Sequence, residues 1–214
     1  MLGEVFVLPR WNITTESIKT MAHFEPAVRK ILEHEGVEFT TDDIPRSGHT
    51  GHIHCIDDPG GETNFGITRK VADENGYAGP MKDISYKKVM NIYRKKYWDK
   101  VCGDKLSGQN LATELFDTAV NCGVEVAVSY LQRTLNAMNK KETKYSDIKV
   151  DGQMGPVTLA TLTVALDVAS YYRLCILRAL DSLQCVRYIN LSERNEKFET
   201  FVPGWLRTRV GGHE

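Results

Sequence analysis

The chain of 214 residues is long enough to form one compact domain, or two small lobes, around a substantial core. Its 27 lysines and arginines nearly balance 28 aspartates and glutamates, so no overall charge would draw the protein to nucleic acid or to an anionic membrane. Apolar residues make up 42% of the sequence, but no apolar run approaches the roughly 20 residues that a membrane-spanning helix needs, so we expect no membrane span.

The first predicted helix covers about residues 24–35. Pro26 suits its first turn, and Gly36 follows its end. Glu35 comes seven residues after Val28, so its carboxyl group shares a stripe with the apolar side chains. Packing of that stripe and the exposed carbonyls of the helix end would both disfavour the charged form, as a general acid near neutral pH requires. The alternative is a glutamate at the edge of the stripe with its head in water.

The segment over residues 37–57 is long for a simple connection. We expect it to form a small hairpin that turns at Ser47-Gly48, with strands built on Val37, Phe39, Ile53 and Ile56. Its middle also contains side chains that could ligate a metal ion, namely His49, His52, His54 and Cys55. The alternative is a polar loop that is rich in histidine by chance.

A second polar stretch begins with Asp57 and Asp58, which precede a Pro-Gly-Gly turn at 59–61. Small polar side chains and a glycine follow that turn, as expected where a polar ligand approaches the backbone closely: Thr63, Asn64, Gly66 and Thr68. Thr68 is also the expected N-cap of a short helix that ends before Gly76.

Apolar periodicity predicts further helices over about 84–98, 109–121, 124–138, 157–166 and 168–189, and another around Trp205. Glu114 is expected to face solvent. Pro156 would occupy the first position of its helix, and the charged stretch 139–149 is the best candidate boundary between two lobes. The turn residues at 151–156 would either position the helix that follows or contact a glycan directly.

Some side chains on these helices are candidates for binding a polar ligand. Trp98 could stack on a sugar ring or pack in the core. Asp117 and Asn121 lie at i and i+4 on one face, where they could bind sugar hydroxyls or cap an adjacent segment. Arg207 and Arg209 could form ion pairs or face a wall polymer, and the sequence leaves both possibilities open.

Seven motifs occur in order along the chain. They are HEG at 34–36, DPGGETNFGIT at 58–68, YRKKYWDK at 93–100, FDTAVNCG at 116–123, LQRTLN at 131–136, DGQMGPVTLATL at 151–162 and GWLRTRV at 204–210. Together they resemble the phage-type muramidases of glycoside hydrolase family 108, which carry a C-terminal predicted peptidoglycan-binding region. One difference is Val37, where the family has a second glycine after the glutamate–glycine pair. Another is the lengthened segment before the Pro-Gly-Gly turn.

The resemblance implies a mainly α, lysozyme-like helical fold with a small β-hairpin or loop insertion near the active site. It also implies an N-terminal extension over residues 1–22 and a muramidase lobe over 23–138. A helical peptidoglycan-binding-like lobe over 139–214 would pack on the muramidase lobe.

The implied activity is hydrolysis of the β-1,4 bond between N-acetylmuramic acid and N-acetylglucosamine in bacterial peptidoglycan. Glu35 would be the general acid, Asp58 or the neighbouring Asp57 would assist, and Thr63 would position a water molecule. Glu33 is the competing acid, but it points about 160° away from Glu35 on the helical wheel. The remaining groove residues would be Asn64, Gly66, Thr68, Trp98, Asp117 and Asn121. The resemblance implies no cofactor and no catalytic metal.

The expected partners are peptidoglycan glycan strands, with no nucleic acid. The first ten residues do not form a secretory signal peptide, and five cysteines without a C-x-x-C pair indicate reduced thiols. We therefore expect synthesis in the bacterial cytoplasm and action on the wall after release, aided by a holin or a secretion apparatus. A protein that binds peptidoglycan or assists secretion without cleavage is the main alternative. A zinc-dependent wall peptidase built on the segment 49–55 is a third.

Overall fold

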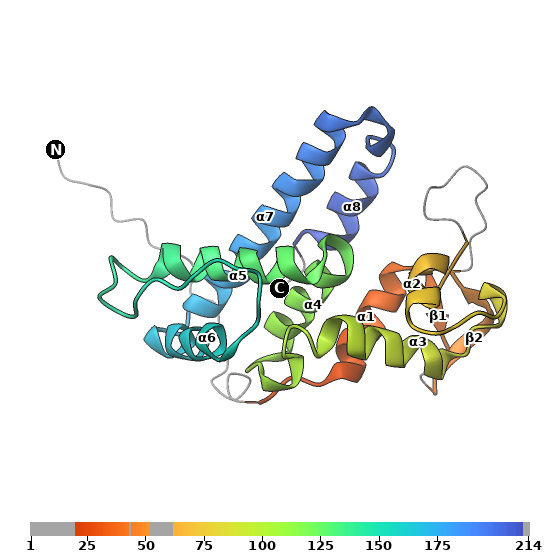
Figure 1. The fold of residues 1–214 in the computed structure, drawn as a ribbon, viewed down its shortest axis with the longest axis horizontal. Coiled ribbons are helices and arrows are strands. Elements are labelled where there is room, and N and C mark those ends of the chain that lie inside the picture. The colour runs from red at the N-terminus through yellow and green to blue at the C-terminus, as the bar shows by residue number, and fades with distance from the viewer. Residues whose placement is uncertain (1–19, 43, 52–61, 212–214) are drawn as a thin grey trace.

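The structure is a computed structural model that describes residues 20–42, 44–51 and 62–211 (Figure 1). Its helices are α1 Phe24–His34, α2 Arg69–Glu74, α3 Tyr86–Tyr93, α4 Gln109–Cys122, α5 Val124–Met138, α6 Pro156–Val168, α7 Tyr172–Arg194 and α8 Val202–Arg209. Two small antiparallel sheets pair β1 Val37–Phe39 with β2 Pro45–Thr50, and β3 Thr63–Asn64 with β4 Ile67–Thr68. The mainly α fold class and the predicted helices are thus confirmed.

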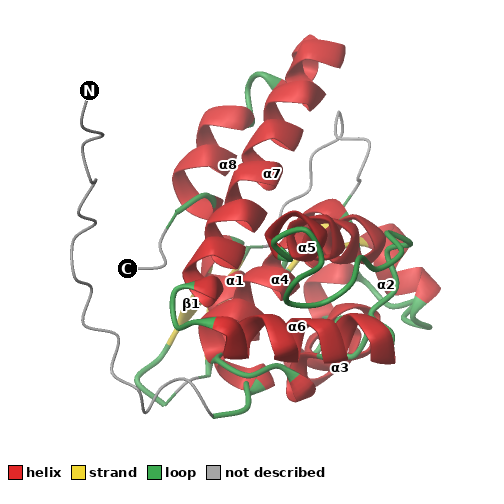
Figure 2. Cartoon of the chain, turned by 90° about the vertical axis from the view of Figure 1, so that its left-hand side faces the viewer, coloured by secondary structure: helices red, strands yellow, loops and turns green. Residues whose placement is uncertain are grey.

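Helix α4 forms the centre of the core, where it packs against α1, α5 and α7 (Figure 1). Every residue from Leu111 to Ala119 is buried, including polar ones, as in a helix that is surrounded by other elements. Figure 2 shows that α7 and α8 extend together away from this body, and the two helices are in contact. Helix α8 returns the end of the described chain to α4, and this return completes the site described below.

Trp98 is part of this core. Its side chain is fully buried, with the ring 5.7 Å from that of Phe24 and 5.4 Å from that of Phe116. Its indole N–H donates a hydrogen bond to Asp104, and a side chain at Gly103 would collide with the ring. The predicted stacking of Trp98 on a sugar is therefore wrong. The ring packs against Phe24 and Phe116 in the core, where a ligand cannot reach it.

The first hairpin turns at a different place from the predicted one. The chain reverses between Thr40 and Ile44, where the N–H of Thr40 donates to the Ile44 carbonyl and the N–H of Ile44 donates to the Thr40 hydroxyl. Ser47 and Gly48, which were expected to form the turn, lie within β2. The residues expected to form the second strand, Ile53 and Ile56, lie outside the described ranges.

The chain before α1 also contacts the body. The N–H of Ala22 donates to the Leu106 carbonyl, and the Thr20 carbonyl accepts from the N–H of Gly108. This pairing places residues 20–22 with the fold, although they were assigned to the N-terminal extension. None of the helices in the described ranges combines the length and the apolar character that crossing a membrane requires. Cys102, Cys122, Cys175 and Cys185 are free thiols.

Gln132 on α5 organises the connection between α5 and α6. It is almost fully buried, and its carbonyl oxygen accepts from the N–H groups of Asp151 and Gly152. Its amide group lies within 3.1 Å of the Asp151 carboxylate, the Gln153 carbonyl and the Thr158 hydroxyl. The turn at 151–156 therefore faces inward and positions α6, which favours the structural interpretation of this motif over direct glycan contact.

Replacing Gln132 with leucine should lower the free energy of unfolding by about 2 kcal/mol or more, because buried N–H and C=O groups would lose their partners. Denaturant unfolding measures the change. Gln153→Leu is the control, because Gln153 is exposed and takes part through its backbone, so its effect should stay within about 0.5 kcal/mol. Equal effects of the two substitutions would contradict this role of Gln132.

Candidate active site

Glu35 is the C-cap residue of α1. Its N–H donates to the Ile31 carbonyl at 3.0 Å, and Gly36 then leaves the helix with a φ of +81°. This conformation is accessible to glycine at little cost, so the predicted helix end after Glu35 is confirmed. The Glu35 side chain is 26% exposed, so it is partly accessible to solvent.

The β3–β4 turn packs directly on the Glu35 side chain. Phe65 and Gly66 both have positive φ, as in the tightest hairpin turns, and the N–H of Phe65 donates to the Thr50 carbonyl. A Cβ atom at Gly66 would lie 2.6 Å from Cγ of Glu35 and 2.7 Å from the hydroxyl oxygen of Tyr93. Gly66 therefore allows the backbone to approach the Glu35 side chain.

The Tyr93 side chain stabilises the β3–β4 turn. Its hydroxyl donates to the Phe65 carbonyl at 2.9 Å, and the side chain is fully buried. Burial, followed by the negative charge of Glu35, raises the pKa of Tyr93 well above its usual value. The hydroxyl therefore keeps its proton and remains a donor throughout the neutral range.

Arg209, the last residue of α8, joins two acidic side chains. It donates to Glu35 Oε1 at 2.6 Å and to Asp117 Oδ1 at 2.8 Å, and the side chains of Arg209 and Asp117 are each only 7% exposed. Burial lowers the pKa of Arg209, but the charges of Asp117 and Glu35 outweigh burial and raise it above its usual value. We call Glu35, Asp117 and Arg209 the acid–arginine cluster.

The cluster corrects the expected environment of Glu35. Apolar neighbours and a helix end were expected to act on its carboxyl group without a nearby cation. The guanidinium of Arg209 instead forms an ion pair with it at 2.6 Å. The sequence offered no signal for this contact, because the two residues are 174 positions apart. Of the two arginines whose role was left open, Arg209 forms ion pairs and Arg207 is exposed.

Asp117 and Asn121 do share a helix face, as predicted. The Asn121 amide donates to the backbone carbonyl of Asp117 at 2.9 Å and to its carboxylate at 3.1 Å. The imidazole Nδ1 of His34 lies 3.8 Å from the same carboxylate. Asp117 is thus engaged by protein groups, whereas Asn121 is exposed at the end of α4.

Glu114 was expected to face solvent, and this prediction is wrong. The residue is 6% exposed and its carboxylate accepts from the Thr118 hydroxyl. Burial, followed by the charges of Asp181 and Asp117, raises the pKa of Glu114 well above its usual value. The error arose because α4 is covered on all sides, which a periodicity argument for an amphipathic helix does not anticipate.

The other predicted residues of the polar stretch hold the backbone in place. Thr63 pairs with Thr68 across the second sheet, and the Thr68 hydroxyl caps α2 by accepting from the N–H of Val71, as predicted. Asn64 is 1% exposed and its amide donates to the Met81 carbonyl, so it is not on the surface as a ligand contact would require.

Some predicted residues lie outside the described ranges. They are Asp57, Asp58, His52, His54 and Cys55. Within residues 20–42, 44–51 and 62–211, His, Cys, Asp and Glu side chains form no group of three or more that could hold a metal ion. Glu33, the competing acid, is about half exposed and pairs with Arg29 at 3.0 Å on the opposite side of α1.

The described residues thus define a helical protein in which a half-buried glutamate at a helix end faces a glycine turn. Residues 28–123 match the family Glycosyl hydrolase 108, and residues 126–210 match the family Predicted Peptidoglycan domain. The chain therefore carries a glycosyl hydrolase 108 domain followed by a predicted peptidoglycan domain, as its motifs indicated.

The fold is also similar to a solved structure, SagA of Brucella abortus. The two chains are 25% identical, with a TM-score of 0.61, and the match covers 87% of this chain and 91% of the other. No curated protein matches the sequence. The two family matches meet between α4 and α5, and the lobe boundary predicted at residue 139 stays a prediction. Arg209 therefore reaches from the second matched region to two acids of the first.

Gly66→Ala should reduce hydrolysis of purified peptidoglycan at least tenfold, because an added methyl group would displace the Glu35 carboxyl group. Gly76→Ala is the matched control, since Gly76 has a φ of +73° but open space around it. Both variants should lose roughly 1 kcal/mol of stability from the positive φ. Equal activity losses in the two variants would show that backbone strain alone, and not the contact with Glu35, explains the effect.

Proposed function

We propose that this protein hydrolyses the β-1,4 bond between N-acetylmuramic acid and N-acetylglucosamine in peptidoglycan, with Glu35 as the general acid. The acid–arginine cluster is the observation that carries the proposal. It fixes one carboxyl group against the Gly66 turn inside the region that matches a glycosyl hydrolase family. Glycosidases of this kind protonate the leaving oxygen from a positioned carboxyl group as the bond breaks.

The exposure of the two acids decides which of them is the candidate general acid. Both carboxyl groups contact the single guanidinium of Arg209. The Glu35 side chain is 26% exposed and that of Asp117 only 7%, so a substrate can reach Glu35 more readily than Asp117. We therefore assign the role of general acid to Glu35, and Asp117 is the buried partner of Arg209.

The second catalytic group is proposed to be Asp58, with Asp57 as the alternative and Thr63 positioning a water molecule. Asp58 is the aspartate of the motif that resembles the family, and Thr63 lies in β3 beside the Gly66 turn. The separation between the second carboxyl group and Glu35 would decide the stereochemical outcome, since short separations give retention and longer ones inversion.

Glu35→Gln should abolish the release of muramic acid reducing ends from purified sacculi, with a loss of at least about a hundredfold. The amide keeps the shape of the side chain and can still contact Arg209, so the folded structure should persist. Glu33→Gln is the matched control, because it changes an exposed glutamate two residues away and should leave activity within about twofold of wild type.

Substantial turnover by Glu35→Gln would remove Glu35 from the role of general acid. Binding to sacculi without release of any reducing ends by the wild-type protein would favour the alternative, a protein that binds the wall or assists secretion without cleavage. The matched predicted peptidoglycan domain is the observation that keeps this alternative in view. Under either proposal the protein must reach the wall, and release through a holin or a secretion apparatus is part of the proposal.

A further inference from the structure

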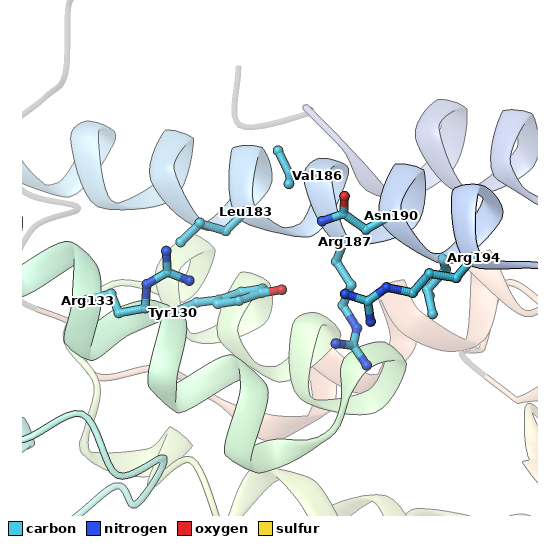
Figure 3. Close-up of a pocket in the computed structure, with 8 residues that line it drawn as sticks. Tyr130, Arg133, Leu183, Val186, Arg187, Asn190 and Arg194 are labelled. Atoms are coloured by element: carbon cyan, nitrogen blue, oxygen red, sulfur yellow. The ribbon is translucent and has the colours of Figure 1, made fainter.

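A basic pocket of about 280 Å³ lies between α5 and α7 (Figure 3). Both helices belong to the region that matches the predicted peptidoglycan domain, and the acid–arginine cluster contributes no side chain to the pocket. One face of α7 supplies most of the lining, at positions separated by three or four residues. The lining residues are Tyr130, Arg133, Leu183, Val186, Arg187, Asn190, Leu191 and Arg194.

Three arginines line this pocket, and none of them is balanced by a carboxylate in the described part of the chain. Figure 3 shows Arg187 and Arg194 extending from α7 toward α5, and Arg133 extending from α5 toward α7. None of the three forms a salt bridge with an acidic residue in the described part of the chain. This differs from Arg29, Arg69, Arg94 and Arg209, each of which is paired with an aspartate or glutamate. The pocket therefore concentrates positive charge that a bound anion would neutralise.

The planar guanidinium groups of these arginines favour a carboxylate over a monoatomic anion as the ligand. Arginine presents a planar set of N–H donors that matches the two oxygens of a carboxylate. The Tyr130 hydroxyl points toward Arg187 across the pocket (Figure 3). Asn190 adds an amide at the same end, and an amide can pair with a peptide group.

The apolar part of the lining indicates what carries the carboxylate. Leu183, Val186 and Leu191 offer aliphatic surface beside the arginines, and methyl-bearing residues could pack there. The volume is near the lower limit for small-molecule pockets, which suits a short peptide and is too small for several sugar rings. Stem peptides of peptidoglycan combine free carboxylates with alanine methyl groups.

We propose that this pocket binds the carboxylates of peptidoglycan stem peptides. The proposal rests on peptidoglycan being the substrate, as proposed above. It gives the second domain a defined task, since a peptide held between α5 and α7 would anchor the wall while the glycan strand reaches the Glu35 site.

The test measures cosedimentation of the protein with purified sacculi, with Glu35→Gln as the parent so that the material stays intact. The double variant Arg187→Gln/Arg194→Gln, made in that parent, should bind intact sacculi roughly tenfold more weakly. On sacculi stripped of stem peptides by an amidase, parent and double variant should bind equally. A free tetrapeptide should compete with intact sacculi for the parent and not for the double variant.

The control variant is Arg178→Gln/Arg207→Gln, which makes the same charge change at exposed positions outside the pocket. Arg178 lies nine residues before Arg187, which places it on the opposite face of α7, about 180° around the helix. The control variant should bind intact sacculi with the same affinity as the parent. Thermal unfolding of both double variants should show the same midpoint as the parent, because the substituted arginines form no ion pairs within the described residues.

Three results would overturn the proposal. They are unchanged binding of the Arg187/Arg194 variant, an equal loss of binding on intact and on peptide-stripped sacculi, and competition by inorganic phosphate but not by the tetrapeptide. The first would leave the pocket without a role, the second would indicate sugar recognition, and the third would indicate a phosphate-bearing wall polymer. Reducing ends measured in the same tubes show whether Glu35→Gln still cleaves, so a failure of the proposed function is recorded separately.

Discussion

The contact of Arg209 with Glu35 and Asp117 is the interaction on which the site depends. Arg209 is the last residue of the last helix, whereas Glu35 caps the end of α1 and Asp117 lies in α4. Loss of one partner from a buried ion pair typically costs about 3–5 kcal/mol, because the remaining charge stays without compensation. The position of the candidate acid is therefore tied to the docking of α8. The second domain is for this reason part of the candidate site.

The same contact determines the shape of the surface around Glu35. The guanidinium holds the carboxyl group from one side, and the Phe65–Gly66 turn, supported by Tyr93, holds it from another. A cavity of about 20 Å³ beside Asp117 and Arg209 has room for water and excludes a sugar. Under the proposed function, a glycan would reach Glu35 through the exposed part of its side chain.

The sequence predicted most of the helices and the position of Glu35 at the end of α1, because both follow from local rules. Helix periodicity located α1, α4 and α5 to within about a residue or two, and Gly36 marked the end of α1 correctly. The errors at Trp98 and Glu114 share one cause. Both side chains lie where several helices pack around α4, and burial on every side leaves no periodic signal that separates core from surface.

Contacts between distant parts of the chain were beyond reach for a different reason. Nothing local to Arg209 distinguishes it from Arg207, yet one is buried in an ion pair and the other is exposed. The hairpin turn was misplaced because Ser47-Gly48 has the composition of a turn, whereas the hydrogen bonds between Thr40 and Ile44 close the real one. Contacts between distant residues decide the first case, and a choice between two nearby turn-forming segments decides the second.

The activity of Arg209→Gln on purified sacculi, compared with that of Arg207→Gln, tests the central claim most directly. Arg209 contacts both Glu35 and Asp117, whereas Arg207 is exposed two residues away on the same helix. The account predicts that kcat/KM of folded Arg209→Gln falls at least about tenfold, because Glu35 loses the group that positions it, and that Arg207→Gln stays within about twofold of wild type. Equal activities of the two variants would contradict the claim that the contact with Arg209 positions Glu35.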